Sequence, residues 1–150
     1  MDTSAKQNSG FALIELMVVI GILGVLLAIT LVAINPAKQF QQANNTKRRS
    51  DTNAIISAVG QYIVENKGQL PAAITTSVQT ISNTASNLCS LLVPTYIAAL
   101  PVDPLTNNGN AVTNCGAAYT TNYTIVKNST GRITVAAPAA QNGETISVNQ

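Results

Sequence analysis

The chain has 150 residues and a formal net charge of +2, which allows one modest domain and an additional segment. Charged residues make up 9% of it, against roughly 25% in a typical soluble domain, and so small a net charge does not indicate a nucleic-acid-binding protein. There is no histidine and there are two cysteines, so the commonest general base and a four-cysteine zinc site are both excluded. We expect neither an enzyme nor a bound cofactor.

An uninterrupted apolar stretch runs from Phe11 to Ile34 and contains one charge, Glu15. A helix of this length spans about 36 Å, enough for a hydrocarbon core of about 30 Å. A core helix of a soluble protein would have a polar face, and this stretch has none. A cleaved secretory signal would have a shorter apolar region that ends in small residues. We therefore expect a membrane span that stays on the protein, with any processing ahead of it, after Gly10.

Glu15 is out of place in such a span, because a carboxylate in a bilayer costs several kcal/mol unless it has a partner. It lies near the expected start of the helix, where the macrodipole favours negative charge. It also lies four positions after Phe11, whose amine a cut after Gly10 would free. The alternative is that Glu15 lies at headgroup level and meets water.

The run GFALIE from Gly10 to Glu15, between a polar leader and the apolar stretch, resembles the processing motif of type IV pilins and pseudopilins. The resemblance implies that a prepilin peptidase cuts between Gly10 and Phe11 and methylates Phe11. It also implies that Glu15 recruits each subunit by pairing with the N-terminal amine of a neighbour. Gly24 falls where the family commonly has a glycine that loosens the helix, and Pro36 lies about one turn after the family's usual mid-helix proline.

The resemblance also implies partners and a location. The partners are other copies of the chain in a helical homopolymer, the prepilin peptidase, an assembly ATPase and a platform protein, with membrane lipid around the span before assembly. The protein would lie in the inner membrane as a single-pass protein and then in an extracellular filament. The basic residues would predict the opposite orientation, because basic flanks of a span normally stay in the cytoplasm. Only Lys6 precedes the span, whereas four basic residues follow it: Lys38, Lys47, Arg48 and Arg49. We follow the family, whose leader faces a cytoplasmic peptidase.

After the span the apolar residues recur at helical spacing. Phe40 and Ala43 open a weak stripe, which Ile55, Val59, Tyr62 and Ile63 continue. Gly68 and Pro71 end it, so one helix is expected from about residue 12 to 67, bent at Pro36. The basic run 47–49 indicates a solvated helix face or, alternatively, contacts with lipid phosphates or with acidic residues of adjacent subunits.

The connection 69–118 is rich in small and polar residues and is expected to contain a short helix around 76–92. The segment LPVDP at 100–104 resembles the loop before the sheet in many pilins and pseudopilins, and some pseudopilins hold calcium near it. Asp103 is the only local carboxylate, which makes it a weak calcium candidate. In an extracytoplasmic head, Cys89 and Cys115 are expected to form a disulfide; the alternative is two free thiols.

The last 32 residues predict three antiparallel strands, at 119–126, 132–136 and 144–148, with turns at Ser129-Thr130-Gly131 and Asn142-Gly143. The amphipathic half of the long helix would cover their apolar face. The expected fold is α+β: a long N-terminal helix packed on a small antiparallel sheet, as in type IV pilins. The expected divisions are a cleaved leader (1–10), a transmembrane half-helix (11–35), an amphipathic half-helix (36–68) and a globular head (69–150), whose sheet is 119–150.

These features predict a structural pilin subunit of a type IV pilus-like filament. Two alternatives stay open: a pseudopilin of a type II secretion system, and a single-pass membrane protein whose head binds a ligand. A membrane-tethered hydrolase is disfavoured, because the chain shows no histidine and no evident acid/base pair.

Overall fold

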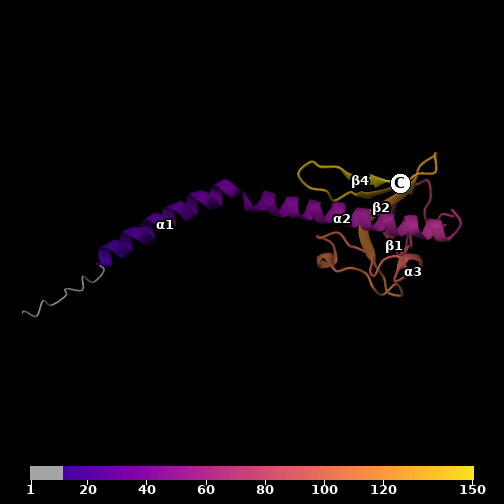
Figure 1. The fold of residues 1–150 in the computed structure, drawn as a ribbon, viewed down its shortest axis with the longest axis horizontal. Coiled ribbons are helices and arrows are strands. Elements are labelled where there is room, and N and C mark those ends of the chain that lie inside the picture. The colour runs from indigo at the N-terminus through magenta and orange to yellow at the C-terminus, as the bar shows by residue number, and fades with distance from the viewer. Residues whose placement is uncertain (1–11) are drawn as a thin grey trace, which may run out of the picture. The chain divides into compact units, whose positions relative to one another are not determined.

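The computed structural model describes residues 12–150 (Figure 1). The predictions for the leader, Gly10 and Phe11 therefore lie outside the described residues. The chain divides into an N-terminal unit that ends at Gln39 and a C-terminal unit, Phe40–Gln150. The C-terminal unit contains most of the second helix as well as residues 69–150, which were expected to form the head.

The first helix, α1 (Leu13–Ile34), is formed by the apolar stretch and leaves all of its residues exposed. Its 22 residues are long and apolar enough to cross a membrane, because a helix of this length spans about 33 Å. The apolar helix expected from the sequence is therefore present.

The expected single helix is interrupted at Asn35. Helix α1 ends at Ile34, Asn35 adopts a left-handed conformation with φ 46°, and helix α2 (Pro36–Glu65) follows. A residue before proline is disfavoured in the right-handed helical region, and asparagine tolerates the left-handed one. The Asn35 side chain also accepts a hydrogen bond from the backbone amide of Lys38 at 3.3 Å, which satisfies one of the free amides at the start of α2.

The buried face of α2 begins with polar residues. Ile55 and Val59 are fully buried and Tyr62 is partly buried, as the stripe predicted. Phe40, however, is 72% exposed, and the same face is continued toward the N-terminus by side chains at three- and four-residue steps: Asn45, Arg48 and Thr52. Burial on α2 therefore starts at Asn45, and its first turns there are polar.

Four antiparallel strands form one sheet in the order β1-β2-β3-β4: β1 (Gln79–Ser82), β2 (Thr120–Lys127), β3 (Ile133–Ala137) and β4 (Ile146–Asn149). The last three lie within two residues of their predicted positions.

The prediction of a helix around 76–92 is wrong. This region holds β1 and only a short helix, α3 (Cys89–Leu92). A 3-10 turn, η1 (Asn107–Gly109), follows it. Backbone pairing with β2, Gln79 opposite Ile125 and Thr80 opposite Thr124, makes 79–82 a strand.

The core of the C-terminal unit lies between α2 and the inner face of the sheet. Alternate residues of β2 and β3, such as Tyr123, Ile125 and Val135, point into it and meet Ile55 and Val59 of α2. The connection adds Leu92 and Leu100, which are both fully buried. This is the expected α+β arrangement, with one more strand than predicted.

Candidate functional site

The first turn of α1 holds the carboxylate that the sequence singles out. Glu15 Oε2 accepts a hydrogen bond from the backbone amide of Ala12 at 3.2 Å, and the Glu15 amide donates to the Ala12 carbonyl at 2.9 Å. The carboxylate thus lies over the positive end of the helix macrodipole, next to backbone amides that have no partner within the helix. This geometry holds the charge at the very start of an otherwise apolar surface.

The rest of α1 offers only packing surface. Thr30 is its one other polar side chain, and the Thr30 hydroxyl donates to the Leu27 carbonyl of its own helix at 2.9 Å. A methyl group added at Gly24 would meet no described atom within 4 Å. Apolar side chains exposed along 22 residues require lipid or another apolar helix to cover them.

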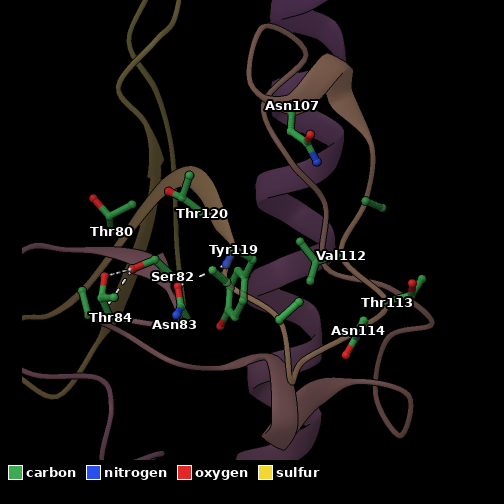
Figure 2. Close-up of a pocket in the computed structure, with 14 residues that line it drawn as sticks. Thr80, Ser82, Asn83, Thr84, Asn107, Val112, Thr113, Asn114, Tyr119 and Thr120 are labelled. Atoms are coloured by element: carbon green, nitrogen blue, oxygen red, sulfur yellow. Dashed lines mark hydrogen bonds between the residues drawn. The ribbon is translucent and has the colours of Figure 1, made fainter.

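A cleft of about 870 Å³ lies in the C-terminal unit, between β1 with its following turn, the loop after η1, and the residues that lead into β2 (Figure 2). Asparagine, threonine and alanine dominate its 14 lining residues, which include Asn83, Asn114 and Tyr119. None of the 14 carries a charge. The cleft is therefore a neutral polar surface.

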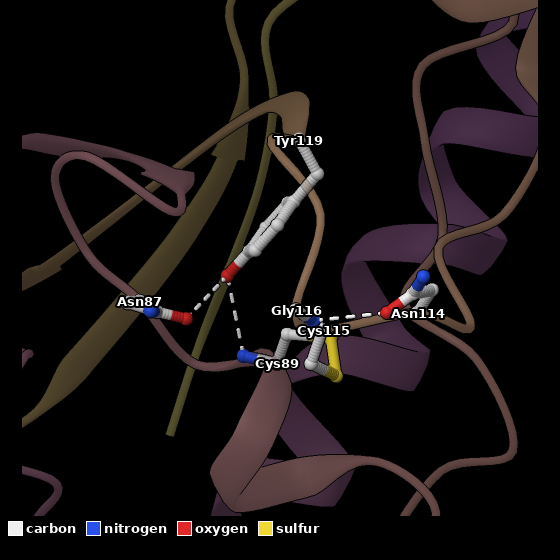
Figure 3. Close-up of a disulfide and its surroundings, with 6 residues drawn as sticks. All are labelled: Asn87, Cys89, Asn114, Cys115, Gly116 and Tyr119. Atoms are coloured by element: carbon white, nitrogen blue, oxygen red, sulfur yellow. Dashed lines mark hydrogen bonds between the residues drawn. A yellow bond between two sulfur atoms is a disulfide. The ribbon is translucent and has the colours of Figure 1, made fainter.

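A disulfide joins Cys89 and Cys115, as expected, with their Cα atoms 5.3 Å apart (Figure 3). It links α3 to the loop that forms one wall of the cleft. Beside it, the Tyr119 hydroxyl accepts a hydrogen bond from the Cys89 amide (3.2 Å) and donates to Asn87 Oδ1 (2.9 Å). Burial raises the pKa of Tyr119, and the hydrogen bond from the Cys89 amide partly opposes this shift. This corner of the fold is closed by both covalent and polar links.

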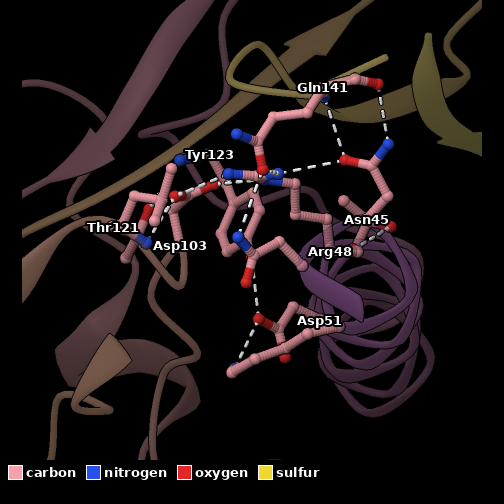
Figure 4. A network of polar contacts seen from close by, with 11 residues as sticks. Asn45, Arg48, Asp51, Asp103, Thr121, Tyr123 and Gln141 are labelled. Carbon is pink, nitrogen blue, oxygen red and sulfur yellow. Dashed lines mark hydrogen bonds and ion pairs between the residues drawn. The ribbon is translucent and has the colours of Figure 1, made fainter. Parts of the chain in front are cut away.

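Arg48 is fully buried and forms an ion pair with Asp103, which is also fully buried (Figure 4). The pair is bidentate: Nε donates to Oδ2 at 2.6 Å and Nη2 to Oδ1 at 3.1 Å. Such a fork is the strongest geometry for this pair. Both oxygens of the weak calcium candidate Asp103 are therefore engaged by the guanidinium, and Oδ1 also accepts from the Leu105 amide at 3.0 Å.

The remaining donors of Arg48 connect α2 to the loop between β3 and β4. Arg48 Nη1 donates to Asn45 Oδ1 at 3.0 Å and to Gln141 Oε1 at 3.3 Å. Asn45 Nδ2 donates to the Gln141 carbonyl (2.8 Å), and Asn45 Oδ1 accepts from the Gln141 amide (3.0 Å). Within residues 12–150, every buried side-chain nitrogen and oxygen has a partner, which is the condition under which buried polar networks are stable.

The basic run 47–49 is solvated in part: Lys47 and Arg49 are exposed, as the solvated-face interpretation predicted, whereas Arg48 is buried. Lys47 pairs with Asp51 at 2.8 Å, and Arg49 pairs with Glu144. Asp51 also accepts from the Tyr123 hydroxyl at 2.7 Å. The physical reason is that Arg48 lies on the same face of α2 as Ile55 and Val59, and each neighbouring cation meets a carboxylate of its own chain.

Sequence reasoning missed Arg48, Asn45 and Gln141 as a unit. One signal was available: Asn45, Arg48, Thr52, Ile55 and Val59 follow the spacing of a single helix face, which placed Arg48 in line with the core. The partner Asp103, 55 residues later, had no such signal. The part of the chain that the structure describes contains no cluster of three or more His, Cys, Asp or Glu side chains able to hold a metal.

Comparison with known proteins points to the N-terminal segment. The family model of the prokaryotic N-terminal methylation motif matches residues 5–31. The N-terminal segment of the chain is therefore similar to that of pilins and pseudopilins. One relative is the type II secretion system core protein G of Pseudomonas aeruginosa, 43% identical over 61 residues; the match covers 41% of this chain and 42% of the relative. No solved structure matches. Together, the motif and α1 indicate anchoring in a membrane.

Proposed function

We propose that the protein is a structural subunit of a type IV pilus-like filament. The observation that carries the proposal is the methylation motif on a helix whose apolar surface has no cover among the described residues of its own unit. Lipid can cover this surface while the subunit is stored in the inner membrane, and identical helices can cover it in a filament. The transfer between the two environments exposes little apolar area to water, so an assembly ATPase and a platform protein can move subunits from one to the other.

The residues near the N-terminus take specific roles in this proposal. A prepilin peptidase cuts between Gly10 and Phe11 and methylates Phe11, and Glu15 pairs with the Phe11 amine of a neighbouring subunit. A misplaced subunit would leave Glu15 unpaired in an apolar environment, which is costly, so the pair sets the register. Gly24 lets α1 loosen in the filament, and the break at Asn35 and Pro36 separates the filament-core helix from the exported part.

The decisive experiment substitutes Glu15→Ala in the full chain and measures its amount in sheared surface filaments by mass spectrometry. We expect normal membrane insertion and loss of incorporation. Thr30→Ala is the matched control, because it removes the other polar side chain of α1, which already has its partner in the same helix. Incorporation of Glu15→Ala at the level of Thr30→Ala would contradict the pairing role. Mature protein that retains residues 1–10 would contradict the proposal as a whole.

A second candidate, a pseudopilin of a type II secretion system, is favoured by the similarity to core protein G. It uses the same α1 chemistry but a different machine. Expression in a strain that lacks core protein G separates the two: restored secretion supports the pseudopilin, and surface filaments without restored secretion support the pilin.

A further inference from the structure

The neutral cleft of the C-terminal unit is a formed site, because links independent of any ligand hold its walls in place. Leu100 and Val112 exchange two backbone hydrogen bonds of 2.9 and 2.8 Å, and the disulfide ties the following residues to α3. On the opposite wall, the Asn83 amide donates to the Tyr119 carbonyl at 3.2 Å, and the Tyr119 amide donates to Asn83 Oδ1 at 3.1 Å. A volume of about 870 Å³ falls within the range of small-molecule sites.

Two carboxamides in the cleft are oriented in advance. The oxygen of Asn83 accepts from the Tyr119 amide, and the oxygen of Asn114 accepts from the Gly116 amide at 3.0 Å. Among the described residues, neither side-chain nitrogen donates to another protein group. Each nitrogen therefore remains a donor for a ligand, at no further cost in side-chain ordering. Threonines and alanines make up most of the other residues that line the cleft.

We propose that this cleft binds a neutral glycan. Sugar hydroxyls match fixed carboxamide donors and threonine hydroxyls, and the C–H faces of a sugar ring match alanine methyl groups. An anionic ligand would find no cation among the lining residues. This proposal does not rest on filament assembly, since every residue it uses lies in the C-terminal unit.

A peptide fits the cleft less well than a glycan. Peptides that bind to sheets add a strand at a free edge, but the outer edge of β1 is occupied by its own chain: the Ser82 amide donates to the Ser86 carbonyl at 3.2 Å, and the Ser86 amide donates to the Thr80 carbonyl at 3.1 Å. Peptide affinity also depends on deep apolar pockets for anchor side chains, and the cleft offers methyl groups instead. Tyr119 is only 9% exposed, so its ring offers little surface on which a sugar could pack. We therefore expect weak glycan binding, with a Kd of about 1 mM.

The test titrates the isotope-labelled full chain, in phosphocholine micelles, with maltohexaose, cellohexaose and N-acetylchitohexaose, and follows the side-chain amide signals of Asn83 and Asn114 by NMR. We expect at least one of these sugars to shift both signals, with a Kd that is unchanged between 50 and 500 mM salt because no charge is involved. Hexagalacturonate and a neutral Asn/Thr-rich hexapeptide are the competing probes.

Ala111 lines the cleft and is exposed, so the larger side chain of Ala111→Phe should occupy space in the cleft. We expect this variant to weaken binding by about tenfold or more. Ala98→Phe, at an exposed position outside the cleft, is the matched control and should leave Kd unchanged. The proposal is overturned if none of the three sugars shifts the two signals, or if Ala111→Phe binds as well as Ala98→Phe. Tighter binding of hexagalacturonate or of the hexapeptide would overturn it as well.

Discussion

Helix α1 and the C-terminal unit depart in opposite ways from the usual distribution of side chains between surface and interior. In α1, apolar residues are exposed along the whole helix, whereas the C-terminal unit fully buries an arginine and an aspartate. Each is the reverse of what a soluble domain usually shows.

The two departures have different causes. The buried ions of the C-terminal unit are tolerated because their own chain supplies every partner. The exposed apolar residues of α1 have no cover among the described residues of their own unit, and lipid or other apolar helices can supply it. The stability of the C-terminal unit and the proposed assembly through α1 therefore depend on different residues and can be changed separately.

The largest expected effect on stability is at Arg48. Arg48→Met leaves Asp103 buried without its bidentate partner, and we expect a loss of about 3–5 kcal/mol in the free energy of unfolding of the C-terminal unit. Urea unfolding of the full chain in micelles, followed by near-ultraviolet circular dichroism, measures the loss. Arg49→Met is the matched control: its pair with Glu144 is partly exposed, so its loss should stay below about 1 kcal/mol.

Arg48→Met combined with Asp103→Asn sharpens the test. Asparagine keeps an oxygen for the Leu105 amide and removes the uncompensated charge, so the double variant should be more stable than Arg48→Met alone. If Arg48→Met and Arg49→Met lose the same stability, the buried pair is not what holds these loops to α2.

The disulfide should have the next largest effect. Cys89 and Cys115 are 26 residues apart, and closing a loop of that length stabilises a fold by about 3 kcal/mol. Cys89→Ala with Cys115→Ala should therefore lower the free energy of unfolding by about that amount and leave the helicity of α1 unchanged. Reduction of the unsubstituted chain is the control, because it opens the same link without removing side-chain atoms. A loss below about 1 kcal/mol in both cases would contradict this expectation.

How far the sequence predicted these structures depends on whether the signal was local. The apolar helix and the strands β2, β3 and β4 have local signals, namely an unbroken apolar run or alternation bounded by turn residues, and their positions were predicted closely. Strand β1 has four residues with one buried apolar side chain, Ile81. It is a strand because β2, some 40 residues away, pairs with it, and no local pattern contains that information.

The polar network shows the same limit for the candidate site. The position of Arg48 on the buried face of α2 could be deduced from helical spacing, but Asp103 and Gln141 reach it from distant loops. A basic run next to an expected membrane span also favoured a solvated or lipid-facing interpretation. Glu15 was easier to identify as a candidate residue, because a single charge in an apolar stretch is visible in the sequence itself.

A smaller effect concerns pH. Burial raises the pKa of Tyr123 above its ordinary value of 10.0, and its hydrogen bond to Asp51 raises it further. Above pH 10 the unfolded chain loses this phenol proton while the folded chain keeps it. The stability that Tyr123 contributes is therefore complete below pH 10 and falls above it, by up to about 1.4 kcal/mol per pH unit.

Thermal unfolding between pH 8 and 11.5 measures this dependence, and Tyr123→Phe should make the alkaline loss shallower. Tyr119, whose pKa burial also raises, contributes a second loss that Tyr123→Phe leaves in place. An identical alkaline slope in the variant would show that the Tyr123 proton is not held by the fold.

The smallest effect compares two helical glycines, one in each region. A methyl group at Gly24 meets nothing within 4 Å among the described residues, whereas at Gly60 it would overlap the carboxamide of Gln150. Alanine stabilises a helix over glycine by about 1 kcal/mol, so Gly24→Ala should slow amide hydrogen exchange in α1. For Gly60→Ala the gain is offset by displacement of Gln150, and we expect a change below about 1 kcal/mol. Because Gln150 is exposed and its side chain is flexible, Gly60→Ala with Gln150→Ala should recover the full gain. If Gly60→Ala alone gains as much as the double variant, Gln150 does not pack on α2 in solution.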